Sequence, residues 1–158
     1  MKGNLPYFYI KENLENTRGI RIYTSEDIPR NIDALNERFY KIPRELVLEI
    51  EKTKNFIFPD LMMNVYPLIS ERFREVLLLF DIEIFVKRVV LIDKESREMQ
   101  SYYLLYTKNL LNTDFNNFFK AVREENKKIR FIVNLDFAES LIRRDVKGIE
   151  FVEVEESV

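Results

Sequence analysis

Residues 129–142 read IRFIVNLDFAESLI, a short apolar run, one polar residue and then a second apolar series. The run at 129–133 is rich in β-branched side chains, which favour a strand. Asn134 suits the N-cap of a helix, because its side-chain oxygen can accept a hydrogen bond from an amide of the first turn. The apolar residues that recur at helical spacing beyond it are Phe137, Leu141 and Ile142. The stretch therefore predicts a strand, a cap and an amphipathic helix.

An earlier stretch, residues 68–77, has the same order of residue types. Ser70 takes the place of Asn134, and in both stretches a phenylalanine, a glutamate and a leucine follow the cap at the same intervals. Short β-like runs then follow at 84–86 and 150–152. One explanation is that any strand–cap–helix unit needs these residue types. The other is an internal β-α-β duplication, and the sequence leaves both open.

The remaining elements are predicted from alternation, turn residues and caps. Strands are expected at 7–10, 20–23, 46–50, 84–92, 99–106 and 149–154, with 84–92 and 99–106 forming an antiparallel hairpin. Helices are expected after the caps Ser70, Asn134 and Asp114, the last with an apolar stripe of Phe115, Phe118, Phe119 and Val122. Gly148 is expected to supply a left-handed helix exit or a tight turn. The predicted fold is α+β, a mainly antiparallel or mixed sheet covered by two or three amphipathic helices.

The composition describes one ordinary domain, residues 1–158, with 46% hydrophobic and 33% charged residues. Lys and Arg number 25 against 27 Asp and Glu, a net charge of −2, which argues against a dedicated nucleic-acid binder. The longest apolar run, 76–80, is far shorter than the roughly 18 residues that span a bilayer. We therefore expect a cytoplasmic protein without a membrane or nucleic-acid partner.

The residue types that are missing limit the chemistry. The chain has no histidine and no cysteine, so it lacks the usual neutral-pH acid–base, the thiolate nucleophile and the preferred ligands of zinc. Its three glycines are too few and too scattered for a phosphate-binding loop. The sequence therefore predicts a non-enzymatic protein without catalytic residues, cofactor or metal.

Several of these motifs also carry a family likeness. Pro59-Asp60, PLISE at 67–71, VVLIDK at 89–94 and NLDFAESLIRR at 134–144 occur in this order. Together they resemble the immunity-protein family eleven of bacterial polymorphic toxin systems, long catalogued as a domain of unknown function. The likeness runs from about Tyr7 to Glu155. The chain differs from the family pattern in having no tryptophan and no Gly-x-Gly element.

The resemblance implies a small α+β immunity protein that binds the effector domain of a cognate toxin and blocks it. The partner would be that effector protein, and the chain would perform no chemistry of its own. An alternative from another class is a non-enzymatic intracellular accessory or structural protein. Such a protein would form a homo-oligomer through an exposed sheet edge or a tyrosine face.

Two groups of residues are candidates for partner binding. The acidic residues near the C-terminus are Glu150, Glu153, Glu155 and Glu156, which could imitate phosphate in a basic cleft. The competing interpretation is a last strand with solvated glutamates and with Phe151 and Val154 turned inward.

The second group is a tyrosine cluster. Tyr102 and Tyr106 share one face of the predicted strand, and Tyr103 lies on the other. An exposed Tyr102 face would offer interface anchors, whereas a covered one would be part of the core.

Overall fold

The computed structural model describes residues 6–13, 18–111, 118–126 and 128–154. Its helices are α2 (Ile32–Glu37), the 3-10 turn η1 (Phe39–Lys41), α3 (Glu71–Leu79), α4 (Lys108–Leu111) and α5 (Leu135–Arg143). Its strands are β1 (Tyr7–Glu12), β2 (Ile20–Ile22), β3 (Glu45–Lys52), β4 (Leu61–Met62), β5 (Leu68–Ile69), β6 (Val86–Asp93), β7 (Met99–Leu105), β8 (Phe119–Arg123), β9 (Ile129–Asn134) and β10 (Ile149–Glu153). No helix in these ranges is long and apolar enough to cross a membrane.

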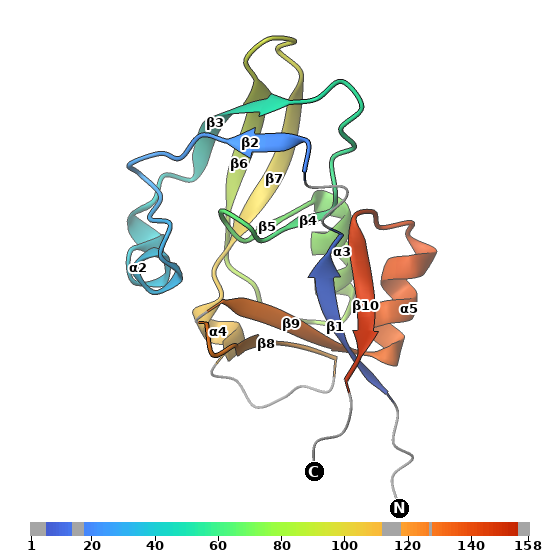
Figure 1. Ribbon diagram of the computed structural model, residues 1–158. Helices are drawn as coiled ribbons and strands as arrows, with labels where there is room; N and C mark the ends of the chain where they lie inside the picture. The colour runs from blue at the N-terminus through green and yellow to red at the C-terminus, as the bar shows by residue number, and fades with distance from the viewer. Residues whose placement is uncertain (1–5, 14–17, 112–117, 127, 155–158) are drawn as a thin grey trace, which may run out of the picture.

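The strands form two sheets (Figure 1). One has the order β10-β1-β9-β8 and is antiparallel throughout. The other has the order β2-β3-β6-β7-β5-β4, in which β3 and β6 run parallel and the remaining neighbours are antiparallel. The α+β prediction is confirmed, and so is the antiparallel hairpin of β6 and β7. The strands predicted at 7–10 and 20–23 both form, but they belong to different sheets.

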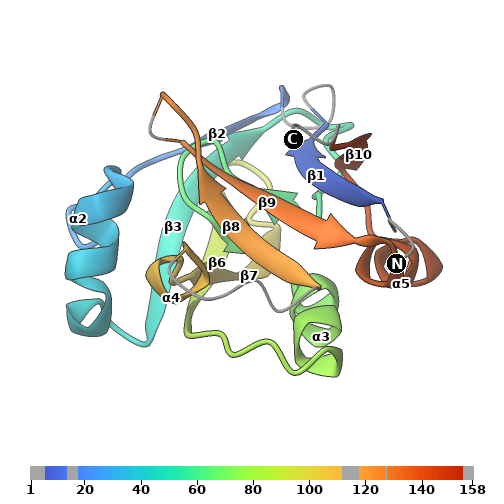
Figure 2. The same cartoon turned by 90° about the horizontal axis from the view of Figure 1, so that it is seen from below.

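The six-stranded sheet separates two hydrophobic clusters. Alternation along its strands sends Ile69 and Leu105 to the first cluster and their chain neighbours Leu68 and Leu104 to the second. The first cluster also contains the buried faces of the four-stranded sheet, α3 and α5, and the second contains Leu35 of α2. Accordingly, α2 and α5 lie on opposite sides of the molecule in both views (Figures 1 and 2).

Two of the three predicted caps, Ser70 and Asn134, are confirmed. The Ser70 hydroxyl oxygen accepts from the Phe73 N–H at 3.1 Å, and Asn134 Oδ1 accepts from the Phe137 N–H at 2.9 Å. The prediction that Ile142 belongs to the apolar face of α5 is wrong, because its side chain is 63% exposed. Each helical residue turns by roughly 100°, which carries Ile142 away from the buried line of Phe137 and Leu141.

The two similar stretches of sequence fold in the same way. β4-β5-α3-β6 and β8-β9-α5-β10 each consist of a hairpin, a helix and a returning strand. In each unit the returning strand lies parallel to the strand before the helix, with one antiparallel strand between them, β7 in the first unit and β1 in the second. A local strand–cap–helix requirement does not dictate this shared sheet order. The structure therefore favours the duplication explanation.

One predicted helix is wrong. Phe119–Arg123 forms strand β8, with Phe119 and Ala121 buried and Lys120 between them less so. The apolar residues recur at helical spacing, but pairing with β9 imposes the strand period of two instead. The expected cap Asp114 and the neighbouring Phe115 lie outside the described residues. Helix α4 was not predicted, whereas the left-handed conformation of Gly148 is confirmed at φ 78°.

Candidate functional site

Two of the four predicted acidic residues lie on an edge strand. β10 is the last strand of the four-stranded sheet, and Glu150 and Glu153 on it are exposed. Glu155 and Glu156 lie outside the described residues. The half-buried Phe151 packs edge-on against Phe8 at 6.3 Å between ring centroids. Ile149 and Phe151 thus pack against the first cluster, whereas Val152 and both glutamates are exposed.

Tyr102 belongs to the core. Its side chain is fully buried in the second cluster, and its hydroxyl donates to the carbonyl oxygen of Pro59 at 2.5 Å. Burial raises the pKa of the Tyr102 hydroxyl far above its usual value, with the charge of Asp60 a smaller cause. The interpretation of Tyr102 as an exposed anchor is therefore corrected, because no part of its ring reaches the surface.

Tyr106 and Tyr103 differ from Tyr102. Tyr106 is half-buried against the second cluster, with the ring of Phe39 at 5.0 Å and that of Phe85 at 6.1 Å. Tyr103 turns to the opposite face, as predicted, where the guanidinium of Arg74 lies 5.0 Å above its ring. The tyrosines therefore do not form a single exposed face.

An exposed apolar surface occurs elsewhere, on the six-stranded sheet. Its four residues, here named the Val47 face, are Val47, Val90, Ile92 and Met99. Val47 and Met99 are 65% and 63% exposed, and the two β6 residues between them are half-buried. Val86, at the far end of the same side of β6, packs against the first cluster. The β6–β7 hairpin extends away from β8 and β9 in Figure 1, which leaves this half of the sheet uncovered.

Charged and polar groups surround the Val47 face. Arg88 pairs with Glu45 at 3.4 Å on one side, and the Tyr23 hydroxyl donates to Glu51 at 2.5 Å on another. The ammonium group of Lys94 lies 4.2 Å above the Tyr23 ring. The alternation of Glu45, Val47, Glu49 and Glu51 along β3 was a sequence signal for a solvent-facing strand side. We did not infer a binding surface from it.

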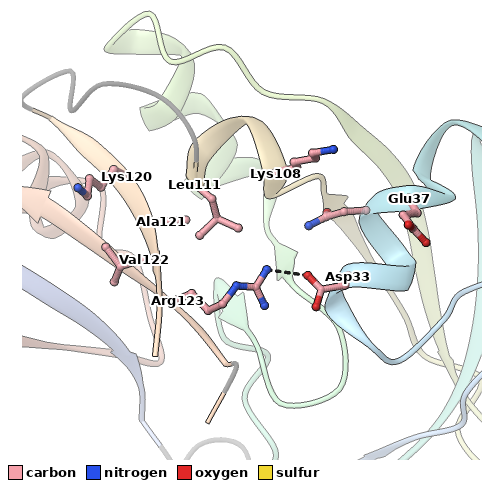
Figure 3. Close-up of a pocket in the computed structure, with 9 residues that line it drawn as sticks. Asp33, Glu37, Lys108, Leu111, Lys120, Ala121, Val122 and Arg123 are labelled. Carbon is pink, nitrogen blue, oxygen red and sulfur yellow. Dashed lines mark hydrogen bonds and ion pairs between the residues drawn. The ribbon is translucent and has the colours of Figure 1, made fainter. Parts of the chain in front are cut away.

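A groove lies between the edge strand β8 and helix α2 (Figure 3). Its volume is about 610 Å³, and Arg123 of β8 reaches across it to Asp33 of α2 at 2.7 Å. Deeper in the fold, the buried Asn36 side chain binds Thr107 through its amide and carbonyl groups. The ion pair between Arg123 and Asp33 joins the two walls of the groove, whose other charged lining residues are Glu37, Lys108 and Lys120.

The acidic turn between β6 and β7 is held in place by side-chain hydrogen bonds. The Asp93 carboxylate accepts from the N–H and hydroxyl of Ser96 and from the N–H of Lys52, and these bonds lower its pKa. Glu98 pairs with Lys52 at 3.1 Å. Within the described ranges, no group of three or more acidic side chains is arranged to hold a metal ion.

Comparison of the chain with protein-family models gives no match, and comparison with curated proteins gives none either. The likeness to an immunity-protein family therefore rests on the sequence motifs alone and stays a prediction.

Proposed function

We propose that this chain is an immunity protein that binds and neutralises the effector domain of a cognate bacterial toxin. The order of motifs that resembles immunity-protein family eleven supports this function. The Val47 face is the structural observation that carries it. A solvent-exposed apolar centre within a charged border is the anatomy of a protein-binding surface.

The residues around the Val47 face indicate what the effector presents to it. Val47 and Met99 offer apolar contacts that a partner can desolvate, which is where most binding free energy arises. The exposed side of β3 adds Glu45, Glu49 and Glu51. Glu49 makes no ion pair or side-chain hydrogen bond to any described residue. The effector would therefore contribute an apolar side chain to the centre and a basic side chain near Glu49.

Inhibition would be steric. The Val47 face lies on a sheet whose other side packs on the second cluster through Val89 and Leu91, both fully buried. A rigid sheet loses little conformational entropy when a partner docks on it. A stable complex needs a total buried area above about 1,000 Å², so the contact would extend past the Val47 face onto its charged border. Covering the effector's active site would then stop its activity.

The test is co-expression of the chain with the effector domain encoded beside it. Wild-type protein should keep the cells alive and should co-purify with the effector. Val47→Asp and Met99→Asp should abolish protection and weaken the purified complex by about tenfold or more, because each buries a charge in the apolar centre. Ile142→Asp is the matched control, since Ile142 is also 63% exposed and lies on α5.

The outcomes test the neutralising function and the role of the Val47 face separately. Cells that die as fast with the wild-type protein as without it, with no complex recovered, would reject the neutralising function. Protection by both Val47-face variants equal to that of wild type would reject this face and leave the function standing.

A further inference from the structure

Along the edge strand β10, backbone groups that point toward β1 alternate with groups that point away from it. The Val154 N–H donates to the Tyr7 carbonyl at 2.8 Å, and the Asn13 N–H donates to the Gly148 carbonyl at 2.8 Å. Both bonds join an even-numbered residue of the β10 segment to β1. Hydrogen-bonding direction alternates along an antiparallel pair. The backbone groups of Ile149, Phe151 and Glu153 therefore point away from β1, toward the outside of the sheet.

These outward backbone groups are available to another strand. Apart from the β1–β10 ladder, no backbone hydrogen bond among the described residues involves Ile149, Phe151 or Glu153. All three residues are half-buried or exposed. The edge has a closed end, because the Asp60 N–H donates to the Lys147 carbonyl at 2.9 Å just before the strand begins. The open part of the edge thus matches the length of β10.

The same edge is acidic. The ionisable side chains of β10 are Glu150 and Glu153, and both are exposed. Neither forms an ion pair with a described residue, although Lys11 lies opposite Glu150 in the β1–β10 register. A strand added here would place its own side chains beside these carboxylates, where basic residues are favoured.

We infer that the β10 edge is a second binding site, which accepts an extended, basic strand from a partner protein. Main-chain hydrogen bonds to the three outward residues would hold the strand, and its lysines or arginines beside Glu150 and Glu153 would select it. This goes beyond the proposed neutralising function, because it uses a surface other than the Val47 face and does not require the partner to be a toxin.

A second copy of the chain fits the same edge less well. Pairing two β10 strands would gather the four glutamates of two IEFVE segments on one ribbon, with no basic residue in either strand. Like charges on neighbouring strands are destabilising, and charged side chains on an edge discourage self-pairing. The charge of β10 therefore favours a basic partner over self-association.

The test uses a displayed library of short random peptides, panned on the full chain. Enriched peptides should carry β-branched residues together with basic residues three positions apart, because Glu150 and Glu153 lie on opposite faces of β10. In amide NMR spectra, a synthetic enriched peptide should shift the signals of Ile149, Phe151 and Glu153 and slow their hydrogen exchange. The Glu150 and Val152 amides should change little, because they already bond to β1.

Three variants distinguish the contribution of backbone hydrogen bonds to peptide binding from the contribution of the glutamate charge. Glu153→Pro removes one outward N–H and leaves the β1 ladder intact, so it should weaken peptide binding about tenfold. Glu153→Ala keeps the N–H and removes the charge, so it should weaken binding only about threefold. Glu83→Ala removes an exposed carboxylate from the segment between α3 and β6 and should leave binding unchanged.

Four results would overturn the site. The first two are a library that shows no enrichment over background and enriched peptides that leave the three outward amides unchanged. The third is a Glu153→Pro variant that binds the peptide as tightly as wild type. The fourth is a dimer, detected by sedimentation equilibrium, that Glu153→Pro dissociates. The last result would assign the edge to a second copy. None of them depends on toxin neutralisation, so this site and the proposed function can fail independently.

Discussion

The hydroxyl of Ser70 donates a hydrogen bond to Oδ1 of Asp60 at 2.5 Å. The other carboxylate oxygen, Oδ2, accepts from the N–H of Lys147 at 2.6 Å. Ser70 caps the start of α3, and Lys147 follows the end of α5. One buried carboxylate therefore connects the two repeated helical units across the first hydrophobic cluster.

Asp60→Ala should lower the free energy of unfolding by about 2–4 kcal/mol, because it leaves the Ser70 hydroxyl and the Lys147 amide without their charged acceptor. Urea denaturation measures the change. Asp136→Ala is the control, since Asp136 is an exposed residue in the first turn of α5 and its loss should cost only about 0.5 kcal/mol. Equal effects of the two substitutions would contradict the connecting role of Asp60.

Tyr102→Phe should destabilise the fold by about 1–2 kcal/mol, because the buried Pro59 carbonyl loses its donor while the ring packing is kept. Tyr40→Phe, at a residue that is 76% exposed, should change the unfolding free energy by less than about 0.5 kcal/mol. Thermal and urea unfolding of both variants provide the comparison. A neutral Tyr102→Phe would mean that the hydroxyl contributes nothing to the core.

Gly148→Ala should destabilise strongly, by about 2 kcal/mol or more, for two reasons. Gly148 has a φ of 78°, and a Cβ there would lie 2.2 Å from Pro59 Cβ and 3.0 Å from Pro59 Cα. Gly19→Ala is the comparison, because its nearest contact is the movable Thr53 hydroxyl at 2.6 Å. Gly19→Ala should therefore cost less, and the reverse order of unfolding midpoints would refute this account.

Glu12→Gln should change how stability depends on pH. Burial raises the pKa of Glu12, Oε1 accepts from the Met63 N–H, and Oε2 is buried with no partner among the described residues. A carboxyl with a raised pKa in the fold stabilises below its unfolded pKa, and that stability is lost as pH rises through the folded value. Wild type should therefore lose stability relative to Glu12→Gln as the pH rises from the unfolded value of 4.5 toward neutrality. Parallel urea-midpoint profiles across this range would contradict the prediction.

Local signals predicted the parts of the fold that depend on near neighbours. Ser70 and Asn134 cap their helices as expected, because a cap needs only a side-chain oxygen and the amides of the next turn. The β6–β7 hairpin and the left-handed Gly148 are local in the same sense. The error at Phe119 concerns which type of element forms, and the error at Ile142 concerns which side of a helix meets the core. Both depend on residues distant in sequence.

The candidate surfaces show the same division. The glutamates of β10 were recognisable from the sequence, but their position on an edge follows from the pairing of β10 with β1 at the other end of the chain. The alternation of β3 indicated a solvent-facing side, whereas its exposure beside Val90 follows from the parallel pairing with β6. From the sequence, Tyr102 could belong to a surface or to the core, and the tertiary structure buries it beside Phe58 and Pro59.

Taken by itself, the order of amino acids determined the capped helices, the β-branched strands and the α+β class, because these depend on backbone preferences over a few neighbouring residues. The tertiary structure decided which strands lie at the sheet edges, which half of the six-stranded sheet is exposed to solvent and which tyrosine is buried. Those outcomes arise from contacts between segments far apart in the chain, where the gain from burying apolar area outweighs local preference.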